Sequence, residues 1–308
     1  MKILFCSDGS SQAEIAVRFG AIIAAGCRAE ASILGIAEKG TDEESLLEAL
    51  LRARDILKEH NLDAELITKS GRPVQEIVKR AREGNYDLVV IGAVRKTTRH
   101  PLWKSVDPLW MSAKAYKIIE SVESPVLVVI GDHSAPRRIL VCTGGGSPAD
   151  KAVEFVGEIA RHVHAVVDLF HALPEPPAMY ADLIRLEEDA ERVLTSLSRL
   201  GRYLRRQKET LEEFGVFGEF RLRHGQVVQE LLKELGREDY DLVVSGYAPD
   251  EDRLHRYLMG DIAREIVNRA EHPVLVIRTV PKGITNRIVD FVGKLFPRSK
   301  ETSEAAGS

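Results

Sequence analysis

The chain has 308 residues, of which 44% are hydrophobic and 29% charged, and its formal net charge is −4. This composition is typical of a globular protein with buried cores, and the length suits two domains. The slightly acidic balance argues against nucleic acid as a partner. No apolar run of about 18 residues predicts a membrane span, and the start of the chain shows no leader pattern, so we expect a cytoplasmic protein.

In chain order, the first half alternates strand-like and helix-like patterns. Short apolar runs at 3–5, 86–90 and 125–129 predict strands that are buried on both faces of a parallel sheet. Apolar residues at helical spacing predict amphipathic helices near 74–81 and 115–122. Such alternation indicates an α/β fold in which helices cover the faces of the sheet.

The second half repeats these blocks in the same order. The matching pairs are KILFCSDGSSQAEIA (2–16) with RILVCTGGGSPADKA (138–152), SGRPVQEIVKRAREGNYDLVVIGA (70–93) with HGQVVQELLKELGREDYDLVVSGY (224–247), and SPVLVVI (124–130) with HPVLVIR (272–278). A repeat of this size indicates that one folding unit was duplicated. We therefore expect two doubly wound parallel-sheet sandwiches, one over 1–132 and one over 136–281.

Two segments have no counterpart in the first half. Residues near 178–214 predict a helical insertion, formed by one long helix with a single apolar face. Residues 282–308 predict an amphipathic helix followed by a disordered end. The helix has an apolar stripe of Ile284, Ile288, Phe291, Val292 and Leu295. Packing on protein and contact with a membrane both stay open for this stripe.

Ligands of open α/β sheets bind beyond the carboxyl ends of the strands. Loops at such ends begin after the first strand of each half, at Asp8 and Gly144, and again at Gly92 and Gly246. A helix that begins nearby, as the capping-box sequence SQAE at 11–14 predicts, offers free N–H groups to a phosphate. The same glycines and Asp8 also suit ordinary tight turns, so both interpretations stay open.

The residue types argue against enzymatic turnover. No Ser-His-Asp, Cys-His or paired-carboxylate set can be assembled from the sequence. The three cysteines are Cys6, Cys27 and Cys142, and none belongs to a CxxC pair. We expect them to be small buried strand residues with no metal-binding or redox role.

Three motifs together resemble the universal stress protein family, once in each half. They are the Asp-Gly-Ser at 8–10, the YDLVV strands that lead to Gly92 and Gly246, and the SPVLVV and HPVLVI strands. The resemblance implies that each half has the adenine-nucleotide alpha hydrolase-like fold. It also implies that the halves pair through their last strands, at 125–130 and 273–278, as an internal pseudo-dimer. Many members of the family bind ATP, so ATP with Mg²⁺ is the cofactor that the resemblance suggests.

When the family's nucleotide site is carried over residue by residue, it is incomplete in both halves. The candidate binding residues are Ser7, Asp8, Ile36 and Gly92 in the first half and Thr143, Gly144, Ala172, Gly246, Gly260 and Asp261 in the second. The first half keeps Asp8 but lacks the glycines that would surround the phosphates. The second half has Gly144 in place of the aspartate and Asp261 where a phosphate-binding hydroxyl is expected.

These observations predict a non-enzymatic stress-response or regulatory protein with degenerate adenine-nucleotide sites. One alternative is an ATP-binding module that senses nucleotide or hydrolyses it slowly. Another is an adaptor that acts on a transporter or membrane through the insertion and the C-terminal helix. A homodimer and an unidentified regulatory protein are the further partners left open.

Overall fold

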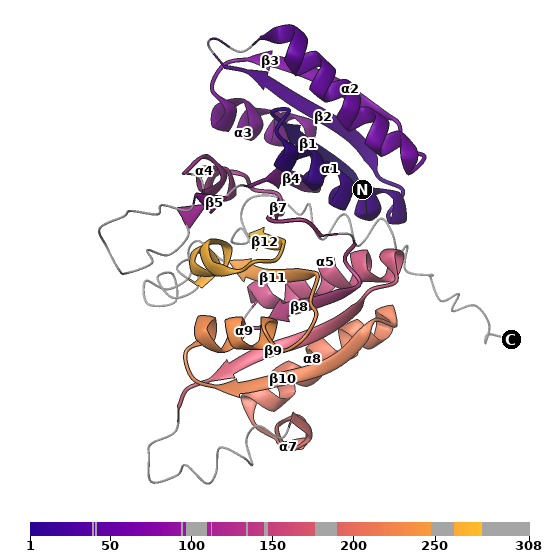
Figure 1. Cartoon of the computed structure of the whole chain (residues 1–308). Helices are drawn as coiled ribbons and strands as arrows, with labels where there is room; N and C mark the ends of the chain where they lie inside the picture. The colour runs from indigo at the N-terminus through magenta and orange to yellow at the C-terminus, as the bar shows by residue number, and fades with distance from the viewer. Residues whose placement is uncertain are drawn as a thin grey trace, which may run out of the picture.

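The computed structural model describes residues 1–38, 40, 42–93, 95–96, 110–111, 113–133, 135–144, 147–175, 190–247 and 262–278. Within these residues one ten-stranded sheet runs through the molecule in the order β10-β9-β8-β11-β12-β7-β4-β1-β2-β3 (Figure 1). The first half supplies β1 (Lys2–Ser7), β2 (Glu30–Ala37), β3 (Ala64–Ser70), β4 (Leu88–Gly92) and β7 (Val126–Val129). The second half supplies β8 (Arg138–Cys142), β9 (Val166–Leu173), β10 (Phe217–His224), β11 (Leu242–Tyr247) and β12 (Val274–Arg278). A separate two-stranded ribbon pairs β5 (Arg95–Lys96) with β6 (Trp110–Met111).

The two halves have the same strand order and meet at the middle of the sheet. All pairs within a half are parallel, whereas β7 and β12 are antiparallel, with Leu127 opposite Leu275. An antiparallel pair between equivalent strands relates the halves by an approximate two-fold rotation, here called the seam. The predicted α/β fold with two equivalent units and their junction at the last strands are confirmed.

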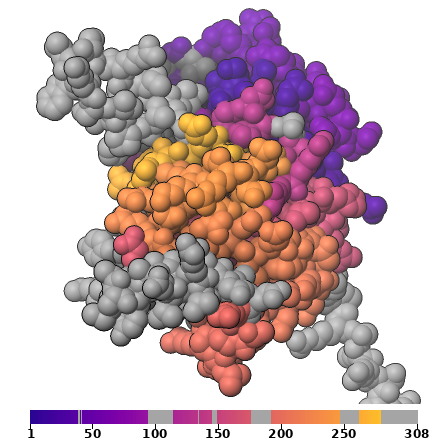
Figure 2. Space-filling model, turned by 60° about the horizontal axis from the view of Figure 1, so that its bottom comes forward, coloured from indigo at the N-terminus to yellow at the C-terminus, as the bar shows by residue number. Residues whose placement is uncertain are grey.

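Helices cover both faces of the sheet. One face carries α1 (Ser11–Gly26), α2 (Glu43–Glu59), α5 (Ser147–Val163) and α8 (Arg199–Phe214). The other carries α3 (Pro73–Gly84), α4 (Ala113–Ser121), α9 (Val227–Leu235) and helical residues 262–269. Side chains of the seam strands alternate between the two cores, as Leu127 and Val126 do. In the space-filling view the yellow residues near 262–278 lie between the orange second half and the magenta first half (Figure 2).

The predicted amphipathic helices are confirmed, but the predicted capping box is wrong. α3, α4, α9 and residues 262–269 each bury the stripe that the sequence indicated. The N-cap of α1 is Ser10 rather than Ser11, because the Ser10 hydroxyl accepts a hydrogen bond from the Ala13 N–H at 3.2 Å. Glu14 therefore lies one position too late to complete a box, and it pairs with Arg52 instead.

The single long helix predicted over 178–214 is also wrong. α7 (Ala190–Thr195) ends before Ser198, whose hydroxyl accepts from the Gly201 N–H at 2.9 Å and so begins α8. α8 connects β9 to β10 as α2 connects β2 to β3, so it is a regular helix of the domain. The extra length of the second half lies in residues 174–198. Residues 176–189 and the C-terminal segment 282–308 lie outside the described residues.

The described helices contain no segment that is long and apolar enough to cross a membrane. Of the cysteines, Cys6 and Cys142 are strand residues as expected, and Cys142 is buried. Cys27 departs from the expectation, because it is the C-cap residue of α1 and is only partly buried.

Candidate functional site

The first-half candidates meet at the carboxyl ends of three adjacent strands. Ser7 ends β1 and pairs with Gly35, directly before Ile36 on β2. On the other side, Cys6 pairs with Ile91, directly before Gly92 at the end of β4. Ser7 and Ile36 are buried, whereas Asp8 is exposed. The structure therefore brings these residues together at one edge of the sheet, and their binding role stays a prediction.

The Asp8 carboxylate is engaged in the turn that starts α1. Its Oδ1 accepts from the Ser10 backbone N–H at 3.0 Å and from the Ser10 hydroxyl at 2.6 Å. Between them Gly9 has φ +79, the left-handed region that favours glycine, and an ideal Cβ there would lie 2.9 Å from the Ala49 Cβ. This arrangement is that of an aspartate which caps a turn, and it leaves Oδ1 with two local donors.

The first turn of α1 packs directly onto the end of β4. An ideal Cβ on Gly92 would lie 2.5 Å from the Gln12 carbonyl oxygen, so only glycine fits without moving backbone. The Gln12 side-chain amide reaches across the end of β7 and donates to the Val129 and Gly131 carbonyls, both at 3.2 Å. The Gln12 amide thus occupies the strand ends where the resemblance would place a phosphate loop.

The second-half crevice has a different chemistry. Thr143 follows β8 in the place of Ser7, is buried, and its hydroxyl donates to the Phe170 carbonyl at 3.2 Å. His171 Nδ1 lies 2.8 Å from the Thr143 carbonyl oxygen, which assigns the proton to Nδ1. Burial lowers the pKa of His171, so its imidazole is neutral at pH 7. Gly144 is exposed and provides no carboxylate, and Ala172 is partly buried beside His171.

One buried hydroxyl of this crevice has no hydrogen-bond partner in the described part of the chain. Ser245 lies on β11 directly before Gly246, and its Oγ is buried and unbonded. Its register partners are Cys142 on β8 and Val276 on β12. Gly260 and Asp261 lie outside the described residues. Sequence reasoning missed His171 and Ser245, although a polar residue at the end of each apolar run was the available signal.

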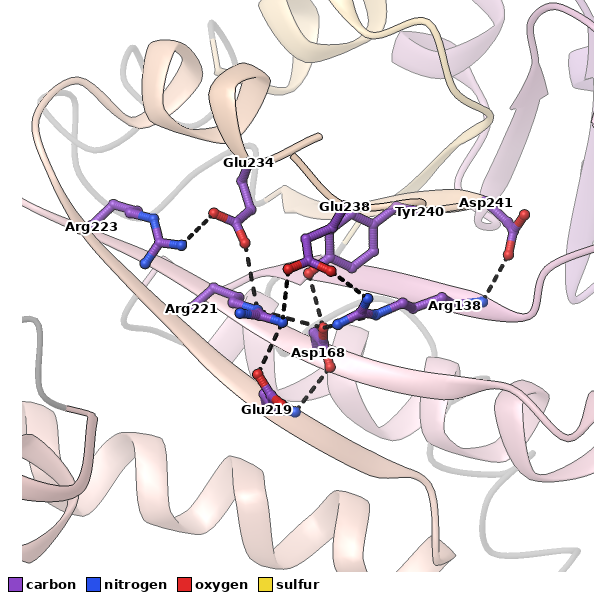
Figure 3. A network of polar contacts seen from close by, with 9 residues as sticks. All are labelled: Arg138, Asp168, Glu219, Arg221, Arg223, Glu234, Glu238, Tyr240 and Asp241. Atoms are coloured by element: carbon purple, nitrogen blue, oxygen red, sulfur yellow. Dashed lines mark hydrogen bonds and ion pairs between the residues drawn. The ribbon is translucent and has the colours of Figure 1, made fainter. Parts of the chain in front are cut away.

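The largest charged cluster lies at the opposite, amino end of the second-half strands (Figure 3). At its centre is Asp168 on β9, which is 1% exposed. The Asp168 carboxylate accepts from Arg138 Nη2 at 2.8 Å, from the Tyr240 hydroxyl at 2.9 Å and from the Glu219 N–H at 2.9 Å. A bulge in β10 makes the last bond, since an ideal Cβ on Gly218 would lie 2.1 Å from Asp168 Oδ1.

The outer part of the cluster ties α9 to β10. Glu234 on α9 is buried and binds Arg223 at 2.6 Å and Arg221 at 3.4 Å. The first half has the reverse charges at this helix–strand contact, since Arg80 on α3 pairs with Glu65 on β3 at 3.0 Å. The counterpart of Asp168 there is Ser32, because Leu4 pairs with Ser32 as Leu140 pairs with Asp168.

We interpret the cluster as structural. Each central carboxylate already has a cationic or N–H partner, so neither is a general base awaiting a substrate. Among the described residues, no group of three or more His, Cys, Asp or Glu side chains could hold a metal ion. The cluster therefore fixes α9 and the edge strand β10 without forming a site.

Gly92→Ala should destabilise the protein by about 1–3 kcal/mol, because the added methyl meets backbone atoms of Gln12 that side-chain rotation cannot move. The matched control is Gly236→Ala, where an ideal Cβ comes no closer than 3.6 Å to any neighbour. Urea unfolding monitored by circular dichroism gives both free energies. Equal stability of the two variants would contradict the close packing of α1 on β4.

Asp168→Ala should lower the free energy of unfolding by about 3–5 kcal/mol, because it leaves Arg138 and Tyr240 partly buried without their shared partner. The control Ser32→Ala, at the equivalent position of the first half, should cost no more than about 1 kcal/mol. Thermal and urea unfolding measure both changes. A loss for Asp168→Ala as small as that of the control would show that the network contributes little.

The protein should lose stability as the pH falls below about 6.5, and His171 should contribute to that loss. The pKa of His171 is lower in the folded than in the unfolded state, so acid favours the unfolded chain, which binds the extra proton. His171→Gln keeps a donor for the Thr143 carbonyl but does not titrate. Its unfolding free energy should therefore fall less between about pH 7 and pH 5.5 than that of the wild type. Parallel pH profiles for the two proteins would exclude this contribution.

Comparison with known proteins extends over both halves. The model of the Universal stress protein family matches residues 1–129 and again residues 136–278. A universal stress protein from Archaeoglobus fulgidus DSM 4304 superimposes with a TM-score of 0.67 at 16% identity, over 90% of this chain and 98% of that one. A functionally unknown protein from Pseudomonas aeruginosa PAO1 superimposes with a TM-score of 0.60 at 17% identity, over 96% of each chain. No curated protein matches the sequence. Since the family model accounts for each half in turn, the chain belongs to the universal stress protein family and carries two of its domains in tandem.

Proposed function

We propose that this protein is a non-enzymatic regulator of the stress response whose two adenine-nucleotide sites are degenerate. The main support is the state of the carboxyl-end crevices. In the first half, the Asp8 carboxylate is bonded to Ser10, and the Gln12 amide is bonded to the carbonyls beyond β7. A nucleotide would have to break these contacts before it gained its own, which lowers its net affinity.

The second half lacks the carboxylate altogether, because Gly144 stands where the first half has Asp8. Without it, a ribose would lose the acceptor that the resemblance assigns to the end of the first strand. The neighbouring polar groups are Thr143 and His171, which bond to carbonyls within the crevice. This half is therefore complementary to a less polar group than a ribose.

Absence of turnover is supported by the state of the nucleophiles in the described residues. Burial raises the pKa of the Cys6, Cys27 and Cys142 thiols to about 12, with a further contribution from Glu158 at Cys27. Such thiols stay protonated and unreactive at neutral pH. All three are free, which suits a reducing compartment, and we place the protein in the cytoplasm on that basis.

The alternative of an ATP-sensing module is supported by one observation in the second half, the buried and unbonded Ser245 hydroxyl next to Gly246. A ligand that donates to or accepts from Ser245 would satisfy this group. The two hypotheses differ in whether Mg-ATP binds at all.

Thermal unfolding of the full chain in the presence of Mg-ATP decides between them. A ligand at about 100 times its Kd stabilises the folded state by about 2.7 kcal/mol, which raises the Tm of a chain of this size by roughly 5 °C. We expect a change below about 1 °C at millimolar Mg-ATP, as for a ligand that does not bind. A saturable rise would contradict the proposal. Its loss in Asp8→Ala would assign binding to the first half, and its loss in Ser245→Val to the second.

A further inference from the structure

The seam is covered differently on its two faces. On one face α1 and α5 are in direct contact, since an ideal Cβ on Gly26 would lie 2.9 Å from the His162 carbonyl oxygen. On the other face α4 and helical residues 262–269 border a groove with about 390 Å³ of empty space, part of which is open to solvent. Its lining residues are Tyr116, Ile119, Glu120, Ala263, Arg264, Val267 and Val276.

The groove is an apolar surface with a charged border. Val276 belongs to the seam strand β12, and the side chains of Tyr116 and Ile119 are only partly buried. The Arg264 guanidinium lies over the Tyr116 ring at 4.7 Å and is thereby positioned at the border. Glu120 is exposed, and within the described residues its carboxylate has no ion-pair partner. An occupant would thus bring apolar side chains, together with a cation for Glu120.

The chain itself leaves the sheet at the edge of this groove. β12 ends at Arg278, and Arg278 Nη1 donates to the carbonyl oxygen of Glu120 at 3.0 Å. Residues 279–308 follow and lie outside the described residues. The connection from Arg278 to Ile284 spans at most roughly 20 Å, which is enough to reach any part of the groove and too short to pass far beyond it.

We propose that residues 284–295 of the same chain dock as a helix in the groove between α4 and residues 262–269. The stripe of Ile284, Ile288, Phe291, Val292 and Leu295 provides one apolar face, and a helix of this length measures about 18 Å. Lys282 and Arg287 flank the stripe near its start and supply cations for Glu120. A short tether gives the segment an effective concentration in the millimolar range, which favours it over the same segment of a second copy.

Hydrogen–deuterium exchange of the full chain and of a chain that ends at Lys282 tests the proposal. Removal of the segment should raise the exchange rate at 116–120 and 262–269 by about tenfold, whereas β1 and β8 should not change. In the full chain, Ile288→Asp and Ile119→Asp should each release the segment and produce the same increase. The control Leu47→Asp changes a half-exposed residue on α2 and should have no effect on these peptides.

Each contrary result overturns the proposal in a distinct way. Equal exchange of the groove in the full and shortened chains would show that the segment does not dock there. Protection that increases with protein concentration would assign the groove to a second copy. Protection of 284–295 that requires vesicles with anionic lipids would assign the stripe to a membrane. Because Ile288 lies outside both domains, Ile288→Asp keeps the test valid even if Ile119→Asp fails to fold.

Discussion

The antiparallel pairing of β7 with β12 is the interaction on which the rest of the structure depends. All four residues of β7 are buried and apolar, so either half alone would expose a flat strand edge that invites aggregation. Joining the two edges satisfies their N–H and C=O groups and makes one continuous sheet. The outer edges β3 and β10 can remain unpaired because charged side chains such as Glu65 and Arg221 line them.

Duplication creates a second difficulty, because equivalent helices could pack on the wrong half. The charges between helix and edge strand oppose this error. If α3 lay over β10, Arg80 would meet Arg221 and Arg223, whereas the native partner of those arginines is Glu234. If α9 lay over β3, Glu234 would meet Glu65, whose native partner is Arg80. Buried like charges are costly, so the reversal of charge between the halves selects the native pairing.

The sequence predicted the elements whose signal is local and missed those that depend on distant residues. Buried β-branched runs and helical stripes identified most strands and helices because burial acts directly on residue type. The break at Ser198 was missed because Leu194 and Leu197 continue the apolar spacing, yet Leu197 is 85% exposed. The role of Asp168 was not predicted, since its partners Arg138 and Tyr240 are distant in sequence and only the fold brings them together.

The antiparallel seam also determines how the two crevices can communicate. Strands of the two halves point in opposite directions, so the crevice beside Ser7 and the crevice beside Thr143 open at opposite edges of the sheet. No small ligand can touch both, and each crevice could therefore diverge by itself, one through Gln12 and the other through Gly144. Any element that contacts both halves must instead cross the seam. The groove beside Val276 does so, because its walls come from α4 of the first half and residues 262–269 of the second. An occupant of this groove would therefore sense the junction of the domains, which no ligand in either crevice contacts.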